Sequence, residues 1–337
     1  MSTRTKSSLV VFVAAGWATL AMWGFLEGCK KDDKETDANA HLKITLRQRY
    51  QPGSYVWEMK ADIKTITDMG QRRDNMKMLM VAQMVVDPMT RMAQQFRVTF
   101  KRIRQDIKNP MMSISYDSEL PAAQQNPMLA GTLQAMLNKE IVVTLDAEGK
   151  TKNVVGMDKI WDAAARDNPA MAGAMQNMKK QFNDETMKQM FSQADQILPN
   201  KPVAVGEKWQ VAAKQGIPMV GEASVTNDCV LKGVKKVKGA ETAIIDFVGK
   251  IVVAEGRQVK PVPGGAKMKF EMTDMKTSGT MNLDVRTGMM TSSTMKQKGN
   301  IKAVIITSQG PQINMSTVMD GTTAVTVTPG VYKRSPR

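Results

Sequence analysis

The stretch SYVWEMKADI, residues 54–63, decides the fold class of this chain. Apolar side chains occupy every second position in it, at Tyr55, Trp57, Met59, Ala61 and Ile63. A period of two places these residues on one face of a strand, because successive side chains of a strand point to opposite faces. Strands with one apolar and one polar face are typical of antiparallel sheets that cover a core on one side.

The same alternation recurs toward both ends of the chain. KITLRQRY (43–50), KMKFEMT (267–273) and TMNLDVR (280–286) each place apolar residues at alternate positions. Glycine appears in DAEGK (146–150) and DVRTG (284–288), where a tight turn needs a positive φ. We therefore predict strands at these positions, with hairpin turns at the two glycines.

Helical periodicity is confined to the middle of the chain. The Asn-Pro pairs at 126–127 and 168–169 each place a capping asparagine before a proline at the first helical position. After Asn183, apolar residues recur at helical spacing. We predict helices at about 127–138 and 158–198.

These patterns predict an α+β fold, mainly antiparallel β, in which curved sheets hold a helical insert in the middle. VVTLDAEGKTKNV (142–154) resembles TMNLDVRTGMMTS (280–292), since both contain a Leu-Asp pair, a glycine turn and a second strand. Two interpretations remain open: duplication of a half-barrel-like unit, or convergence of two hairpins on the same turn chemistry. The two strand-rich units would span 43–200 and 201–330, before a basic tail at 331–337.

The N-terminus has the pattern of an export signal. Arg4 and Lys6 precede a charge-free run at 9–26. Signal peptides have apolar regions of about 7–15 residues, and a membrane span becomes feasible at about 18, so this length fits either. A lipoprotein signal, an uncleaved anchor and an ordinary secretion signal are the three alternatives.

The end of this run favours a lipoprotein signal. In WGFLEGCKKDD (23–33), residues 26–29 resemble the bacterial lipobox, with a branched apolar residue three positions before the cysteine and glycine directly before it. The resemblance implies a signal peptide at 1–28 and lipid attachment, as palmitate, at Cys29. Glu27 departs from the lipobox pattern, in which small uncharged residues are usual.

Residues 29–42 mix charges and lack branched apolar side chains, so we expect a solvated tether. It would place the body at a bacterial envelope membrane, facing the periplasm or the cell surface, and Lys30 favours the outer membrane. The full chain has a net charge of +15, and without residues 1–28, which contain Arg4, Lys6 and Glu27, the mature chain would have +14. This charge would meet lipid headgroups and other anionic envelope surfaces there. No aromatic residues interleave with the basic run at 231–239, which argues against nucleic acid.

Several motifs together resemble an uncharacterised family of bacterial envelope lipoproteins, catalogued as a domain of unknown function. Besides the lipobox-like start and the Leu-Asp-x-x-Gly hairpin, they are Pro-Gly-x-Tyr at 52–55, the methionine-rich strand at 75–84, YDSE at 116–119 and LPNKPVAVGEKW at 198–209. The resemblance spans nearly all of the mature chain. It implies export and a strand–helix–strand order, and it implies no catalytic residues.

Patterns of catalysis and metal binding are scarce. His41 is the single histidine and lies in the tether, which argues against histidine triads and histidine-based zinc sites in the body. Ser293 and Lys296 match a Ser-x-x-Lys motif, but in a predicted strand they point to opposite faces. We interpret Asp117 and Glu119 as a solvated strand end. We predict a non-catalytic protein without a metal or a cofactor.

The two cysteines do not indicate a disulfide. If Cys29 is acylated, Cys229 has no partner. Ala223, Val225 and Leu231 share the strand face of Cys229, so we expect a small buried side chain there rather than a reactive thiol.

Methionine is abundant, at 30 residues, whereas aromatic residues make up 5% of the chain. Its flexible side chain adapts to irregular apolar partners. The candidate residues of a lipid-sized groove on a curved sheet are Met76, Met78, Met80, Met84, Met268, Phe270 and Met272. Without a cavity, the same residues would simply fill a core. The sequence thus predicts a non-catalytic structural or interaction module of the envelope, or alternatively a protein that binds lipid or another apolar small molecule.

Overall fold

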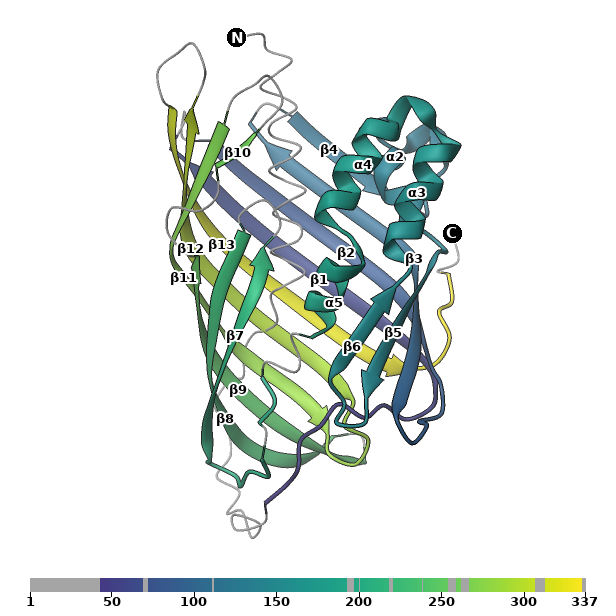
Figure 1. Ribbon diagram of the computed structural model, residues 1–337, viewed down its shortest axis with the longest axis vertical. Helices are drawn as coiled ribbons and strands as arrows, with labels where there is room; N and C mark the ends of the chain where they lie inside the picture. The colour runs from purple at the N-terminus through teal and green to yellow at the C-terminus, as the bar shows by residue number, and fades with distance from the viewer. Residues whose placement is uncertain are drawn as a thin grey trace.

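The computed structural model shows one large antiparallel sheet, with helices inserted in the middle of the chain (Figure 1). The sheet curves around one interior and does not close on itself. This confirms the predicted fold class. The residues that the structure describes are 43–68, 72–110, 112–192, 197–199, 201–217, 221–237, 239–253, 259–261, 267–306 and 313–334.

Thirteen strands make up the sheet in this described part of the chain. They are β1 Gly53–Thr67, β2 Arg72–Val86, β3 Ala93–Asn109, β4 Met112–Asp117, β5 Glu140–Asp146, β6 Thr151–Val155, β7 Lys208–Ile217, β8 Gly221–Val237, β9 Ala240–Val253, β10 Val259–Pro261, β11 Lys267–Asp284, β12 Met290–Ile306 and β13 Ile313–Pro329. Their order across the sheet is β6-β5-β3-β2-β1-β13-β12-β11-β9-β8-β7, while β4 pairs with β3 and β10 pairs with β11.

β1 and β13 are the first and last strands in the sequence, and they pair antiparallel with each other near the centre of the sheet. The regions 43–200 and 201–330 therefore contribute to one continuous sheet. The two edges are β6 and β7, the strands that flank the last three helices in the sequence.

The burial pattern of β1 is the one that its sequence predicts. Tyr55, Met59, Ala61 and Ile63 are buried, and Trp57 is half-buried on the same face. β11 confirms the prediction for TMNLDVR in the same way, because Met281 and Leu283 are both buried. The inner face of the sheet thus carries the apolar half of each alternating pattern.

The helices are α2 Pro127–Met136, α3 Met157–Asp167, α4 Ala172–Gln181 and α5 Asp184–Phe191. Helix α2 begins at the predicted proline. The predicted helical stretch 158–198 is divided into three helices, the last of which ends at Phe191, so the prediction is wrong for residues 197 and 198, which form a turn. After α3, a short 3₁₀ turn with Pro169 at its first position interrupts the helix. Asn183 caps α5, because its Oδ1 accepts a hydrogen bond from the backbone N–H of Thr186 at 2.8 Å. Among the described residues, no helix has the length and apolarity that a membrane crossing requires.

Helix α5 bridges the gap between the two edges of the sheet. It contacts both β6 and β7 (Figure 1). Its first residue, Asp184, accepts a hydrogen bond from the backbone N–H of Met157 at 2.7 Å, which ties α5 to the start of α3. Trp161 of α3 donates its indole N–H to the carbonyl of Phe182 at 2.6 Å, just before α5.

The prediction of a strand at 43–50 is wrong. This segment keeps its alternating burial, with Leu46 and Gln48 buried, but it joins no ladder and forms a single bridge, from Ile44 to Val203. Leu46 belongs to a core cluster that contains Val203 and also buried residues of β8, β9 and β11. Alternation therefore indicated a segment with one buried face, without giving it a strand partner.

The turns of the two similar hairpins hold this segment. Gly149 and Gly288 both have positive φ values, of 85° and 65°, as predicted. A Cβ on Gly149 would collide with the carbonyl oxygen of Gln48, and one on Gly288 with the carbonyl oxygen of Arg47. Glycine is thus required at both turns for the backbone conformation and for close approach to the same segment.

Candidate functional site

The predicted groove methionines of β2 lie inside the curved sheet. Met76, Met78, Met80 and Met84 are all buried and belong to one large core cluster. This agrees with the face that the sequence assigned to them. Met268, Phe270 and Met272 lie in β11, but their side chains are outside the described part of the structure.

An enclosed cavity of about 120 Å³ lies in the interior of the sheet. Its wall is mainly aromatic and thioether, and it comes from the 43–50 segment, seven strands, helix α5 and Leu198. The lining residues are Gln48, Tyr50, Trp57, Met59, Met84, Phe96, Val98, Phe100, Thr151, Met187, Phe191, Leu198, Met281, Leu283, Met290 and Val327. Of the predicted groove residues with described side chains, Met84 alone borders this cavity.

Aromatic side chains are concentrated at this site. The chain contains five tryptophans, four tyrosines and eight phenylalanines, and five of these residues line the cavity. Phe96 makes edge-to-face contacts with Tyr50 and Phe191, with ring centroids 5.3 and 5.9 Å apart. Such pairs contribute about 0.5–1.5 kcal/mol beyond their buried area. The three rings come from distant segments, so no local pattern in the sequence indicated the cluster.

The position of Tyr50 is set by polar contacts around it. Gln94 accepts a hydrogen bond from the backbone N–H of Tyr50 at 3.1 Å and donates one to its carbonyl at 2.6 Å. The Tyr50 hydroxyl donates to Oε1 of Gln48 at 2.7 Å. The cavity is therefore bounded on one side by a segment that is fastened through its backbone.

A second, larger hollow of about 410 Å³ is open to solvent and has a charged lining. Its charges are paired: Lys60 lies 2.7 Å from Glu58, Lys77 lies 3.5 Å from Asp62, and Arg104 lies 3.0 Å from Asp106. Exposed pairs of this kind are worth about 0–1 kcal/mol and leave no unpaired charge for a ligand. We therefore take the enclosed apolar cavity as the candidate site.

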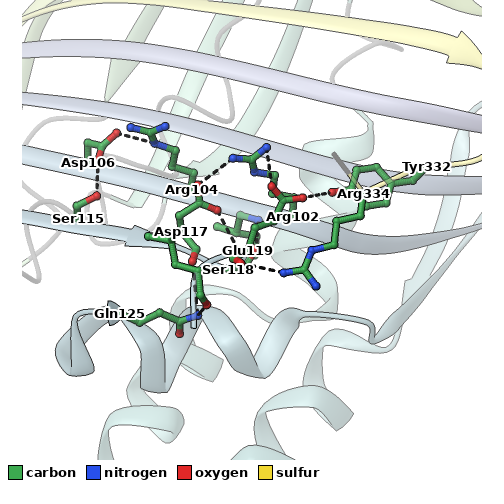
Figure 2. A network of polar contacts seen from close by, with 12 residues as sticks. Arg102, Arg104, Asp106, Ser115, Asp117, Ser118, Glu119, Gln125, Tyr332 and Arg334 are labelled. Atoms are coloured by element: carbon green, nitrogen blue, oxygen red, sulfur yellow. Dashed lines mark hydrogen bonds and ion pairs between the residues drawn. The ribbon is translucent and has the colours of Figure 1, made fainter. Parts of the chain in front are cut away.

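Asp117 and Glu119 form part of a polar network and not a solvated strand end (Figure 2). Arg102 contacts Asp117 at 2.8 Å and Glu119 at 2.9 Å, and Asp117 is only 8% exposed. The Tyr332 hydroxyl donates to Glu119 at 2.7 Å, and Arg334 donates to the Glu119 carbonyl at 2.8 Å. The basic tail is thus fastened to the outer side of β3 and β4, a contact that the sequence did not predict.

The electrostatics of this network favour its ion pairs. The hydrogen bond to Asp117 is the main cause that raises the pKa of Arg102. Burial, followed by the hydrogen bond to Glu119, raises the pKa of Tyr332 to about 12. Arg102 therefore remains charged and Tyr332 neutral at ordinary pH, which suits a structural contact.

The other residues considered for catalysis or metal binding do not come together in one site. Ser293 is buried on the inner face of β12, whereas Lys296 is exposed on the outer face, so the two do not meet. Cys229 is a free, buried cysteine, and burial raises the pKa of its thiol to about 12. No group of three or more His, Cys, Asp or Glu side chains that could hold a metal occurs in the described ranges. Cys29 and His41 lie outside those ranges.

A family model described as "Family of unknown function (DUF6263)" matches residues 93–290, which is more than half of the chain. The chain belongs to the DUF6263 family. This agrees with the resemblance to a family catalogued as a domain of unknown function. The DUF6263 region starts with β3, includes the helices and ends at the start of β12, and it supplies ten of the sixteen residues that line the cavity.

Solved structures resemble this DUF6263 chain only distantly. A lipovitellin structure, titled "Lipid-protein interactions in lipovitellin", has a TM-score of 0.42 at 9% identity, and the alignment covers 85% of this chain and 26% of that one. The transport unit of the autotransporter AIDA-I from Escherichia coli has a TM-score of 0.24 at 8% identity, covering 86% and 94%. The outer membrane protein OprG from Pseudomonas aeruginosa has a TM-score of 0.20 at 5% identity, covering 84% and 100%. No curated protein matches the sequence.

Proposed function

We propose that this DUF6263 protein binds an apolar ligand, such as the acyl chain of a lipid, in the cavity inside its curved sheet. The observation that supports this proposal is the enclosed aromatic and methionine wall around about 120 Å³. Ligand sites are typically concave, mostly apolar and provided with a few polar groups, and Gln48 and Thr151 are the polar residues of this wall.

The size of the cavity fits part of an acyl chain. Apolar cavities of about 150 Å³ stay dry and bind benzene, so a space of this order accepts a ring or a short alkyl segment. Five methionines line it, at positions 59, 84, 187, 281 and 290. Their unbranched side chains change rotamer easily, which allows the space to lengthen around a longer chain.

Helix α5 provides the route of entry in this proposal. It covers the gap between β6 and β7, and its Met187 and Phe191 both face the cavity. Movement of one short helix would therefore expose the interior, whereas the paired strands elsewhere would have to break ladder hydrogen bonds.

We propose further that acylation of Cys29 anchors the protein in the bacterial cell envelope. Support comes from the basic start, the apolar run, the lipobox-like residues at 26–29 and the charged tether. An anchor of this kind would keep the cavity close to a membrane that supplies lipid. We expect Cys29→Ala to retain residues 1–28 and to lose incorporation of labelled palmitate. Equal palmitate incorporation in the variant and the wild type would refute acylation at this residue.

The binding proposal is tested by reconstituting the full chain in phosphatidylcholine vesicles with a photoreactive fatty acid. We expect labelled peptides from the cavity wall. Val98→Phe places a larger side chain in the cavity and should reduce labelling severalfold. Val248→Phe on the outer face of β9, where the valine is 60% exposed, is the matched control and should leave labelling unchanged.

The result also separates the two predicted functions. A structural or interaction module with a collapsed methionine core gives no labelling above that of a protein-free vesicle. Labelling that is insensitive to Val98→Phe would place the lipid elsewhere and overturn the cavity as the site.

A further inference from the structure

A row of polar residues crosses the inner face of the sheet beyond the cavity. The strand register places Asn227, Gly249, Thr277, Gln297 and Gly321 side by side on β8, β9, β11, β12 and β13. All three side chains of this row are buried. The inner positions on either side of the row are mostly apolar, so the row is a polar band between apolar stretches of the inner face.

The glycines of the row leave room for the polar groups beside them. A Cβ on Gly249 would collide with Oγ1 of Thr277 and Oδ1 of Asn227. A Cβ on Gly321 would lie 3.2 Å from Nε2 of Gln297. The polar atoms therefore lie close over the backbone of neighbouring strands, where a larger residue would displace them.

Two buried polar atoms of β12 have no hydrogen-bond partner within the described residues: Nε2 of Gln297 and Oγ of Ser293. Both residues are 3% exposed. A buried polar group without a hydrogen-bond partner destabilises the folded state, and native proteins leave few of them. A polar ligand at this face would supply the missing partners.

The position of Ser293 connects this polar face to the cavity. Ser293 lies opposite Met281 in the register, and Met281 lines the cavity. Ser293 and Gln297 are four positions apart, a distance of about 13 Å along a strand. A ligand with its apolar end in the cavity would thus meet Ser293 first and Gln297 farther along the same inner face.

The charged residues buried in the described part of the chain indicate which kind of headgroup the polar row can accept. The buried charged residues in the described part of the chain are Asp117 and Asp284. Asp117 pairs with Arg102, and Asp284 accepts the backbone N–H of Thr287 in a hairpin turn. Among the described residues, an ionic headgroup at the polar row would be buried without a counter-ion, which is strongly unfavourable. Hydroxyl, ester and amide groups match a serine hydroxyl and a glutamine amide instead.

We infer that Ser293 and Gln297 form a subsite for the uncharged polar headgroup of an amphiphile whose alkyl chain occupies the cavity. The ligand class is a neutral acyl lipid with free hydroxyl and ester groups, as in a monoacylglycerol. This inference rests on the proposed binding of an apolar ligand. It adds a preference for a neutral headgroup over a carboxylate on the same chain.

The test compares two photoreactive lipids with the same diazirine acyl chain, a monoacylglycerol and a fatty acid. Each is added at equal concentration to the full chain in phosphatidylcholine vesicles at pH 8, where the fatty acid is largely ionised. We expect about tenfold more labelling by the monoacylglycerol, the ratio that corresponds to about 1.4 kcal/mol. Gln297→Leu and Ser293→Ala should each reduce monoacylglycerol labelling by about fivefold or more and leave fatty acid labelling unchanged.

The controls separate headgroup recognition from folding. Lys298→Leu changes the next residue of the strand, which is exposed on the outer face, and should leave both labelling levels unchanged. Gln297→Leu removes a buried Nε2 that has no hydrogen-bond partner within the described residues, so its melting temperature without ligand should not fall. If Gln297→Leu fails to fold, the smaller change Ser293→Ala decides the question.

The outcomes distinguish this inference from the proposed function on which it rests. Absence of labelling by either lipid in the wild type overturns both. Equal labelling by the two lipids, or a preference that survives both inner-face variants, overturns the headgroup subsite and leaves apolar binding in place.

Discussion

The substitution Gly288→Ala tests whether a hairpin turn holds the 43–50 segment. Gly288 has a φ of 65°, and an added Cβ would collide with the carbonyl oxygen of Arg47 and lie 2.6 Å from the backbone nitrogen of Arg49. Gly206 is a matched control, because its φ is 83° but a Cβ there would meet nothing within 4 Å. The difference between the two alanine variants isolates contact with the segment.

The structure gives a magnitude for each variant. Left-handed backbone costs a non-glycine residue about 1–2 kcal/mol, and this cost is common to both positions. Relief of the collision at Gly288 requires the segment to move, which weakens the burial of Leu46 and the paired hydrogen bonds between Tyr50 and Gln94. Burial of a leucine is worth about 1.5–3 kcal/mol, and each hydrogen bond about 1 kcal/mol. We expect Gly288→Ala to cost about 2–4 kcal/mol more than Gly206→Ala.

Thermal unfolding and limited trypsin digestion of the full chain measure this effect. Arg47 and Arg49 are exposed, so trypsin cleavage after them reports release of the segment. Gly288→Ala should melt at least about 4 °C below Gly206→Ala and be cut faster at these two arginines. Equal melting temperatures and equal cleavage rates in the two variants would refute the role of the turn.

Three further predictions concern buried groups. Arg102→Met should destabilise the fold by about 3 kcal/mol, because it leaves the buried carboxylate of Asp117 unpaired. Arg104 is more exposed, so Arg104→Met should cost less than about 1 kcal/mol. Chemical denaturation of both variants measures the difference. Tyr332 should show no phenolate absorbance until the pH approaches 12. Because its folded pKa is raised, its contribution to stability is complete below about pH 10 and lost as the pH rises toward 12. Tyr332→Phe should remove this share of the alkaline loss of stability and leave the share of Tyr55 and Tyr116, whose pKa values burial also raises. The Cys229 thiol should resist alkylation at pH 8 in the folded protein and react after unfolding, and rapid labelling of folded protein would contradict its burial.

Much of the fold could be predicted from the sequence, because a strand with one buried face has apolar residues at every second position. β1 and the second half of β11 show the alternation that was expected of them, and Gly149 and Gly288 stand at the turns. The strand order could not be predicted, since the pairing of β1 with β13 depends on contacts across nearly the whole chain. The 43–50 segment shows that alternation measures one-sided burial and not ladder pairing.

The candidate site was less predictable than the fold. Methionines of β2 were correctly placed on the inner face, because their spacing is local. The cluster of Tyr50, Phe96 and Phe191 combines a non-strand segment, a strand and a helix that are far apart in the sequence. The pairing of Arg102 with Glu119, and the attachment of the tail through Tyr332, likewise required the three-dimensional arrangement.

The antiparallel pairing of β1 with β13 constrains when this protein can fold. A ribosome makes β1 before every other strand of the described sheet and β13 after them, so one neighbour of β1 does not exist until the intervening strands have been made. Contacts of such long sequence separation are associated with slow folding. The β1–β13 ladder at the centre of the sheet therefore cannot form until β13 has been translated, so the two halves of the sheet should join only after both have been made.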